Sequence, residues 1–355
     1  MITWRQGTVR RLGREWAGAL ECDVDTEGGP LPALAYPQLV GRPEPGDRVV
    51  LNTAALELAL GTGGYALVVA LPDRLPPDRA GAGHLVKARY TPLQAVVLGV
   101  EEPASPHHNL VGGSDTLGGM PVVVADLHSA LPAVLAGILA DRSAARVAYV
   151  MTDGAALPLW YSRTVAALAE RLCGTVTVGQ AFGGDLEAVT LHTGLLAARD
   201  ALRADVAIVT QGPGNLGTAT RWGFSGVAAG EAVNAVAVLG GRPIAALRVS
   251  EVDPRERHRG VSHHSLTAYG RVALARADVV VPAHLADALA GELAPLADRH
   301  RLVTVGVDGL LDALRALPVA LSTMGRGLDE DPAYFLAGAA AGRHAAGLLG
   351  RSADE

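Results

Sequence analysis

The stretch PVVVADLHSALPAVLAGILADRSAARVAYVMT, residues 121–152, contains the pattern that decides the fold. An apolar run, Val122–Ala125, leads into an alanine- and leucine-rich segment, Ala130–Ala140, and then into a second apolar run, Arg146–Met151. Short runs of β-branched residues without polar alternation are typical of strands that are buried on both faces. A strand, a helix and another strand in this order predict a parallel sheet that is covered by helices on both sides.

The same alternation continues through the rest of the chain. Further strands are predicted at Thr175–Val178, Val206–Thr210, Ile244–Val249, Val279–Val281 and Leu302–Val305. Further helices are predicted at Pro158–Leu172, Glu187–Leu202, Gly226–Leu239, Leu266–Ala277, Leu285–Ala297 and Leu310–Ala316. A last helix begins at an N-cap, Asp331, followed by Pro332. Residues 101–355 therefore predict a doubly wound, mostly parallel, Rossmann-like α/β domain of about seven strands with a C-terminal helix.

Residues 1–100 predict a small β-rich domain. Short segments separated by Gly, Pro and Asp are expected to be its strands: Gln6–Leu12, Ala17–Val24, Ala33–Leu39, Asp47–Asn52 and Tyr65–Leu71. Strands at this spacing favour an antiparallel barrel or sandwich. The segment Pro72–Gly83 is expected to be an exposed connection, and His84–Glu102 to be one long strand that leads out of the domain.

Composition excludes several classes of protein. Hydrophobic residues make up 49 % of the chain, but no apolar run of about 18 residues occurs, so no transmembrane helix is predicted. The first residues lack the apolar core of a signal peptide, and Cys22 and Cys173 are too few for a disulfide framework. We expect a soluble cytoplasmic protein. A net charge of −6 and an aromatic content of 4 % disfavour a nucleic-acid partner.

Two common catalytic motifs are absent from the sequence. Lys87 is the only lysine, and no GxxxxGK[ST] motif occurs, which excludes a P-loop NTPase. No GxSxG motif occurs either, which argues against the nucleophile elbow of an α/β-hydrolase.

Polar residues follow the predicted strands, at the edge of the sheet where α/β proteins bind ligands. Asp126 and His128 follow the first strand in a D-x-H spacing that allows both side chains to bind one metal ion. Asp153 follows the second strand and Asp185 the third, and either carboxylate suits acid–base catalysis or metal binding. The alternatives are a helix cap for Asp126 and a hydrogen-bonded loop residue for His128.

The loop after the fourth strand is rich in glycine. Gly212, Gly214 and Gly217 relax its backbone, and their N–H groups, with Asn215 among them, are expected to cradle an anion. The G-x-G-x-x-G spacing also occurs in dinucleotide-binding proteins, but there the helix begins within the motif, whereas here another segment intervenes. A tight loop shaped by sterics alone is the alternative.

Three of the eleven histidines, His258, His263 and His264, fall within seven residues after the fifth strand. Ser262 is expected to cap a helix whose first turn contains His263 and His264, and a helix N-terminus keeps an imidazole neutral. Neutral imidazoles bind metal ions and accept protons. The same tract contains three arginines that suit a carboxylate or phosphate ligand, Arg255, Arg257 and Arg259, of which Arg255 and Arg257 are the predicted ligand residues. A solvated polar loop is the alternative.

Six segments of the chain are similar in sequence to one known family. They are YTPLQ at 90–94, EEPASP at 101–106, TDGAALP at 152–158, GQAFGGDLEA at 179–188, residues 212–226 with RWGFSG at their end, and residues 255–267. Together they resemble a bacterial family known as a domain of unknown function, over nearly the whole chain. The resemblance implies no activity, cofactor or catalytic residue, so the functional hypotheses come from the residues themselves.

The sequence supports two functional hypotheses that use the same strand ends. The first is an enzyme that acts on a small anionic metabolite by hydrolysis assisted by a divalent metal ion. Its catalytic residues would be Asp153, Asp185, His263 and His264, and its metal ligands Asp126, His128 and His258. The second is a non-catalytic regulatory protein that binds a nucleotide or metabolite through the glycine loop and the arginines. The small residues of the last helix suit packing on the sheet or on the second subunit of a homodimer.

Overall fold

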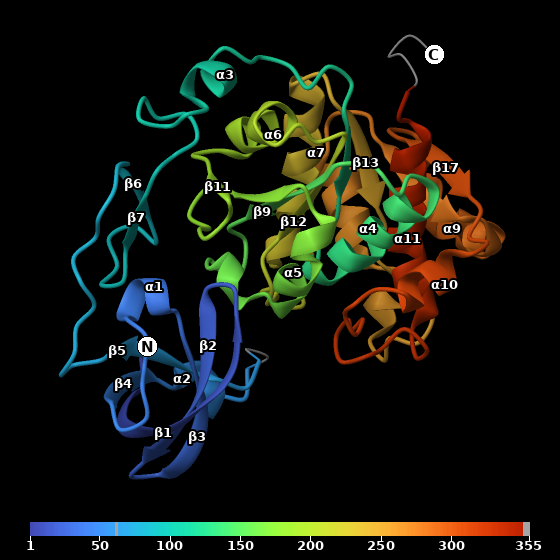
Figure 1. Cartoon of the computed structure of the whole chain (residues 1–355). Coiled ribbons are helices and arrows are strands. Elements are labelled where there is room, and N and C mark those ends of the chain that lie inside the picture. Colours follow the sequence, from blue (N-terminus) through green and yellow to red (C-terminus); the bar gives the residue numbers. More distant parts are fainter. Residues whose placement is uncertain (61–62, 351–355) are drawn as a thin grey trace. The chain divides into compact units, whose positions relative to one another are not determined.

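The structure is a computed structural model that describes residues 1–60 and 63–350. The chain forms two compact units, each described by itself below (Figure 1). One unit consists of Met1–Val97 together with Trp160–Ala166, and the other of Leu98–Leu159 and the described residues from Ala167 onward. The sequence predicts a single domain boundary at residue 100. In the structure Trp160–Ala166 also belongs to the first unit.

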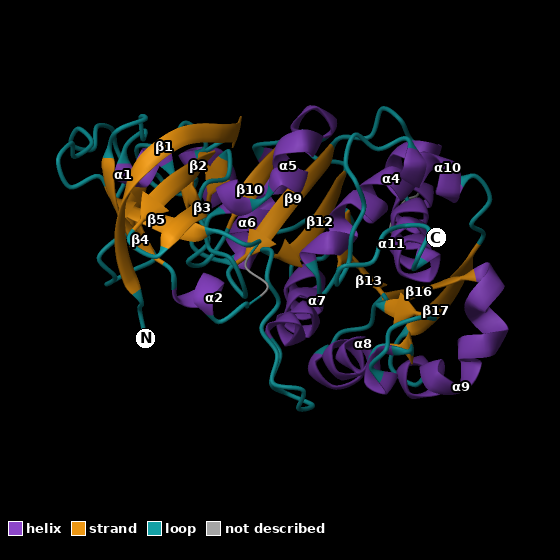
Figure 2. Cartoon of the chain, turned by 90° about the horizontal axis from the view of Figure 1, so that it is seen from below, coloured by secondary structure: helices purple, strands orange, loops and turns teal. Residues whose placement is uncertain are grey.

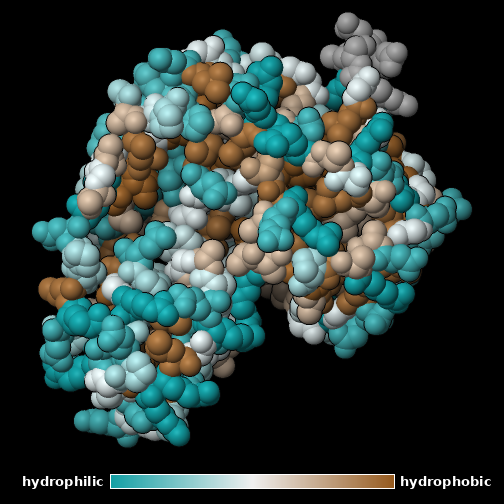
Figure 3. All heavy atoms as spheres, in the orientation of Figure 1, coloured by the Kyte–Doolittle hydropathy of each residue, from teal (hydrophilic) through white to brown (hydrophobic). Residues whose placement is uncertain are grey.

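The first unit is a closed β-barrel with the strand order β1-β2-β3-β5-β4. Side chains alternate between the inside and the outside of each strand, so Leu20, Cys22 and Val24 of β2 are buried while Glu21 and Asp23 between them are not. Figure 3 shows mainly hydrophilic side chains over the barrel on the face that it displays. The strands are β1 Trp4–Trp16, β2 Ala19–Thr26, β3 Gly29–Ala35, β4 Arg48–Asn52 and β5 Ala66–Ala70, with short helices α1 Pro37–Val40 and α2 Ala54–Glu57.

The segment Trp160–Ala166 packs within this unit through its aromatic side chains. The indole Nε1 of Trp16 donates to the carbonyl oxygen of Trp160 at 2.7 Å, and the rings of Tyr36 and Trp160 lie 6.1 Å apart. The prediction of one helix over Pro158–Leu172 is therefore wrong in length, because this contact interrupts it. Helix α5 covers only Arg163–Leu168.

The prediction of a long strand over His84–Glu102 is also wrong. Two short strands, β6 Leu85–Lys87 and β7 Ala95–Val97, pair antiparallel instead. Between them Ala88 and Tyr90 have φ angles of 47° and 63°, in the left-handed region, and the chain turns back on itself. The backbone N–H of Tyr90 donates to the side chain of Gln94 at 3.0 Å, which holds the turn.

Eight parallel strands form the sheet of the second unit, in the order β11-β10-β9-β12-β8-β13-β16-β17. The chain enters at β8, builds outward through β9, β10 and β11, returns to insert β12 beside β8, and builds outward again through β13, β16 and β17. This is a doubly wound sheet, so the predicted fold class is confirmed. The strands are β8 Pro121–Val124, β9 Val147–Thr152, β10 Gly174–Thr177, β11 Leu186–Glu187, β12 Val206–Gln211, β13 Arg242–Ala246, β16 Asp278–Pro282 and β17 Arg301–Val305.

Helices cover both faces of this sheet. Figure 2 shows α4 and α11 on one side of the strands and α7 and α9 on the other. Helix α6 begins at Leu191, later than the predicted Glu187, because Glu187 pairs in β11 and Thr190 forms a capping box with Thr193. The helices are α3 His108–Gly112, α4 Leu131–Asp141, α6 Leu191–Asp200, α7 Ala228–Val238, α8 His263–Thr267, α9 Ala286–Ala297, α10 Leu310–Arg315 and α11 Pro332–Gly347.

Two glycines allow α4 and α11 to pack with their backbones in contact. A Cβ atom on Gly342 would clash with the carbonyl oxygen of Val134, and one on Gly137 would clash with that of Ala339. The alanines and glycines of α11, from Ala337 to Gly342, are buried here in the core of the unit. In the part of the chain that the structure describes, no helix is both long and apolar enough to cross a membrane.

We expect Gly342→Ala to destabilise the protein by about 2–3 kcal/mol, because the added methyl group forces α11 away from α4. Gly347→Ala is the matched control on the same helix, since no atom lies within 4 Å of a Cβ at that position. Helix propensity alone should leave that variant as stable as the wild type or up to about 1 kcal/mol more stable. Urea unfolding of both variants measures the difference, and equal midpoints would contradict the proposed close packing.

Candidate functional site

A short hairpin positions the histidine tract beside the end of β13. Strands β14 Val249–Ser250 and β15 Gly260–Val261 pair antiparallel and close the loop between them. The N–H of Ser262 then donates to the carbonyl oxygen of Arg248 at 2.9 Å. As its place in the sequence predicts, Ser262 is the N-cap of α8, and its Oγ accepts from the N–H of His264 at 3.2 Å.

The three histidines of this tract form one cluster. One ring nitrogen of each of His258, His263 and His264 lies within 4.8 Å of those of the other two. The ring centroids of His263 and His264 are 4.4 Å apart, and that of His258 lies 4.9 and 4.8 Å from them. His258 and His264 are buried, whereas His263 is partly exposed, so the cluster reaches the surface at His263.

Neighbouring groups fix the orientation of these rings. Nδ1 of His258 shares a hydrogen bond of 2.7 Å with Oγ of Ser262. The ring of Phe224 stacks on that of His264, with centroids 3.7 Å apart and an interplanar angle of 3°. Nε2 of His263 is buried and has no hydrogen-bond partner among the described residues. His258 and His263 thus each leave a ring nitrogen that can bind a ligand.

Burial keeps two of the imidazoles neutral. Desolvation, together with the charges of Arg248 and Arg255, lowers the pKa of His258 to about 3. Desolvation lowers the pKa of His263 to about 4, assisted by the charges of His264 and Arg257. Both rings are therefore uncharged at neutral pH, the state in which imidazole binds a metal ion.

Asp126, at the carboxyl end of β8, is the nearest carboxylate to this cluster. Its Oδ2 lies 3.6 Å from Nδ1 of His264, although 138 residues separate the two in sequence. This oxygen is buried and accepts no hydrogen bond from the described part of the chain. The same His264 nitrogen receives a long hydrogen bond of 3.3 Å from the guanidinium of Arg248. Two groups of opposite charge therefore face one ring nitrogen.

The glycine loop is attached to the same strand end. Gln211, the last residue of β12, donates from Nε2 to the carbonyl oxygen of Asp126 and to Oδ1 of Asn215, both at 2.8 Å. Oδ1 of Asn215 also accepts from Oγ of Ser225 and from the N–H of Gly226, each at 3.3 Å. Since Phe224 precedes these residues and stacks on His264, the loop lies beside the histidine cluster.

This loop has free backbone donors. The N–H groups of Gly214, Asn215 and Gly217 have no hydrogen-bond acceptor within the described residues. Gly214 has a φ of 90°, a conformation that glycine adopts without strain. Gly212 differs, because its N–H donates to the carbonyl oxygen of Thr152 at 3.3 Å. Three of the four loop residues singled out from the sequence thus have an N–H that is available to an anion.

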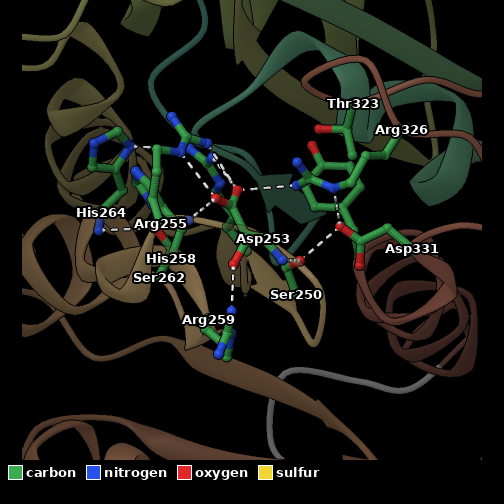
Figure 4. A network of polar contacts seen from close by, with 12 residues as sticks. Ser250, Asp253, Arg255, His258, Arg259, Ser262, His264, Thr323, Arg326 and Asp331 are labelled. Atoms are coloured by element: carbon green, nitrogen blue, oxygen red, sulfur yellow. Dashed lines mark hydrogen bonds and ion pairs between the residues drawn. The ribbon is translucent and has the colours of Figure 1, made fainter.

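A buried network of charges lies beneath the cluster (Figure 4). Asp253 is fully buried and accepts two hydrogen bonds, of 2.9 and 2.8 Å, from the guanidinium of Arg255. It also accepts from the backbone N–H of Arg255 and from Arg326, each at 3.0 Å. Arg326 also donates to Asp331 at 3.0 Å, and Oγ of Ser250 donates to the same carboxylate at 2.7 Å. Arg255, a predicted ligand residue, is therefore engaged by Asp253, whereas Arg257 has no hydrogen bond to another described residue.

The remaining predicted residues have other contacts. Nδ1 of His128 shares a hydrogen bond of 2.9 Å with the hydroxyl of Tyr149, and burial lowers the pKa of His128 to about 4. The carboxylate of Asp153 accepts from the N–H of Gln180 at 2.8 Å. That of Asp185 accepts from the N–H and the hydroxyl of Thr175, near the start of β10. These residues are not brought into the metal-ligand cluster, which consists of the three histidines of the tract.

Sequence reasoning missed three residues of the site. Arg248 falls inside the predicted strand Ile244–Val249, where a lone charge in an apolar run is the signal that would have revealed it. Gln211 similarly ends an apolar strand with a polar side chain. Phe224 carries no such signal, because an aromatic residue in a loop is an ordinary core residue.

Comparison with known proteins gives one match. Residues 32–342 match the model of a family described as "Protein of unknown function (DUF3866)". The match covers most of the chain and confirms the resemblance to a domain of unknown function. No curated protein and no solved structure matches the chain significantly.

We expect Asp253→Asn to destabilise the protein by about 3 kcal/mol at pH 7, because it leaves the partly buried guanidinium groups of Arg255 and Arg326 without their carboxylate. Burial alone raises the pKa of Asp253, but hydrogen bonds and charges from Arg255 and Arg326 outweigh it and hold the pKa far below its usual value. The carboxylate therefore stabilises the fold above about pH 4, where it is ionised in the unfolded chain as well, and this contribution declines below that pH.

Urea unfolding at pH 7 and at pH 3.5 measures both effects. The gap in stability between wild type and variant should narrow at the lower pH, since the wild type loses part of a contribution that the variant lacks. A gap that stays constant, or a variant as stable as the wild type at pH 7, would contradict this assignment.

Proposed function

We propose that this chain, which belongs to the DUF3866 family, is a metal-dependent hydrolase that acts on a small anionic substrate. The site would lie at the carboxyl ends of β12, β8 and β13, where the direction of chain winding reverses. The observation that carries the proposal is the cluster of His258, His263 and His264, whose ligand nitrogens lie within 4.8 Å of one another.

The three histidines fit a catalytic metal centre. Three protein ligands that leave one position open are typical of catalytic zinc sites, and imidazole also suits other divalent transition metals. Zn–N bonds of about 2.1 Å in a tetrahedral site place the nitrogens about 3.4 Å apart, so separations of up to 4.8 Å would shorten by up to about 1.4 Å. Small rotations of the side chains accomplish such a movement.

The groups around the histidines fit the outer shell of a metal centre. A metal-bound histidine almost always donates its second ring N–H to an oxygen. Ser262 Oγ is in place to accept from Nδ1 of His258, and Asp126 Oδ2 from Nδ1 of His264, which would direct both Nε2 atoms inward. Asp126, expected from the sequence to be a ligand, would then act as an orienting group.

A divalent metal held in this way supplies a nucleophile by lowering the pKa of a bound water to near 7. The residues of the chain would bind and orient the substrate. Arg257 and the N–H groups of Gly214, Asn215 and Gly217 offer positive charge and donors to an anion beside the cluster. His263, the most exposed of the three histidines, lies on the side from which substrate would enter.

We expect tag-free protein to contain about one equivalent of zinc or another divalent transition metal per chain by elemental analysis. Replacing any one of His258, His263 and His264 with alanine should reduce this content strongly, because two ligands rarely retain the ion. His284→Ala is the control, since His284 is exposed and outside the cluster. Wild-type protein that takes up no metal, even when zinc is offered, would reject the proposal.

Asp126→Ala is expected to weaken zinc binding by about 10–100-fold, the usual effect of removing an outer-shell partner. Competition with a chromophoric chelator measures this affinity. Asp115→Ala, at an exposed carboxylate away from the histidines, is the control and should bind zinc like the wild type. Unchanged affinity in Asp126→Ala would remove Asp126 from the metal centre.

A non-catalytic role as a binding protein is favoured by a separate observation, the free N–H groups of the glycine loop. Such a protein would hold a nucleotide or metabolite without bound metal. A melting temperature that rises with a nucleotide in metal-free protein, together with no metal uptake, would support this role over hydrolysis.

A further inference from the structure

Arg248 is a buried arginine whose partners are incomplete. Its side chain is 4 % exposed, yet one of its terminal nitrogens has no hydrogen bond among the described residues. That nitrogen lies 3.9 Å from Asp253, at the outer limit of an ion pair. The other terminal nitrogen donates to Nδ1 of His264 at 3.3 Å, which is a long hydrogen bond. Buried arginines are normally paired closely with an anion.

Neighbouring carboxylates are occupied by other arginines. Asp253 is bound closely by Arg255 and Arg326, at 2.8 and 3.0 Å, and Arg326 also binds Asp331. Asp126 is the third carboxylate of this region, and its contact is with His264. The three positive charges of this network (Arg248, Arg255 and Arg326) balance its three carboxylates (Asp126, Asp253 and Asp331). A divalent cation at the histidines would therefore give these groups together a net charge of +2. An anion beside Arg248 would reduce that excess in a site that is shielded from water.

Two partners compete for one nitrogen of His264. Nδ1 can accept a hydrogen bond from Arg248, or it can carry a proton and donate to Asp126. One nitrogen cannot do both at the same time. If Nε2 binds a metal ion, the ring proton must be on Nδ1. The ring then turns its N–H to Asp126, and Arg248 loses its acceptor. Metal binding would therefore release a buried guanidinium group on the other side of the His264 ring from the metal.

We infer that Arg248 binds an oxyanion group of the substrate, phosphoryl or carboxylate, and that it does so once a metal ion is bound to the histidines. This inference rests on the proposed function and assigns its substrate-binding residue. A guanidinium group binds either oxyanion through paired N–H donors. Metal and anion would bind with positive coupling, since each favours the same arrangement of His264 and Arg248.

Calorimetric titration with inorganic phosphate, and separately with acetate, tests the inference. Both probes are titrated into wild-type protein in its metal-free form and with one equivalent of zinc. At least one of them should bind about 10-fold or more tightly to the zinc-loaded protein, within the usual range of coupling between two sites. A preference for phosphate would identify a phosphoryl substrate, and a preference for acetate a carboxylate substrate. Equal affinity with and without zinc would overturn the coupling.

Arg248→Met should abolish the zinc-dependent gain while elemental analysis still finds the metal. Arg248→Lys, which keeps the charge but lacks the paired donors, should retain part of the gain and guards against a loss caused by misfolding. Arg142→Met is the control, because Arg142 is an exposed arginine at the end of α4 and outside the histidine tract. Urea midpoints confirm that each variant is folded.

The inference and the proposed function fail in different ways. Zinc-loaded Arg248→Met and Arg248→Lys that both bind phosphate or acetate like the wild type would overturn the role of Arg248 and leave the metal centre standing. Wild-type protein without metal uptake would overturn the proposed function and, with it, the release of Arg248 by metal.

Discussion

The position of β8 between β12 and β13 is the constraint on which the site depends. In a parallel sheet the carboxyl ends of neighbouring strands meet at one edge, so Asp126, Gln211 and the hairpin that carries the histidines converge there. The chain leaves β8 for one face of the sheet, through α4, and leaves β12 for the other, through α7 (Figure 2). The two connections take opposite faces of the sheet because the direction of winding reverses at β8.

A network of buried ion pairs connects the hairpin that carries the histidines to the start of the last helix. The network around Asp253 joins the hairpin at Ser250 to Arg326 and to Asp331, the residue before α11 (Figure 4). Buried ion pairs are weak evidence for stability, because the desolvation of each charge cancels much of their attraction. Their geometric demands are strict, however, and this network holds Arg255 in place beside the histidines. Asp331, the N-cap of α11, thereby connects the start of that helix to the hairpin that carries the histidines.

The main strands and helices of the second unit could be predicted because apolar runs and helical segments alternate regularly. The N-cap role of Ser262 could be predicted because serine is a preferred N-cap residue and stands directly before the helix. The turn at Ala88 and Tyr90 could not be predicted from the sequence, because neither residue type usually adopts a positive φ angle. Asp185 follows a strand in sequence, yet its carboxylate turns back to Thr175 near the start of β10. Parallel strands place Asp126 and His264 at one edge of the sheet, as expected from the sequence. Which of the strand-end residues lies nearest the histidines depends on strand order, which local sequence does not encode.

The loss of charge on His258 and His263 explains how these rings can be packed beside His264 by folding alone. Three carboxylates within 5 Å of one another would repel, and burying them without a cation would cost far more than packing uncharged rings. Here burial lowers the pKa values of His258 and His263, and the resulting neutral rings pack against one another and against Phe224 like other aromatic groups. Oγ of Ser262 accepts from the N–H of His264 in the first turn of α8, and the same oxygen shares a hydrogen bond with Nδ1 of His258. The cluster can therefore form as part of the core, with its free nitrogens already gathered for a ligand that arrives after folding.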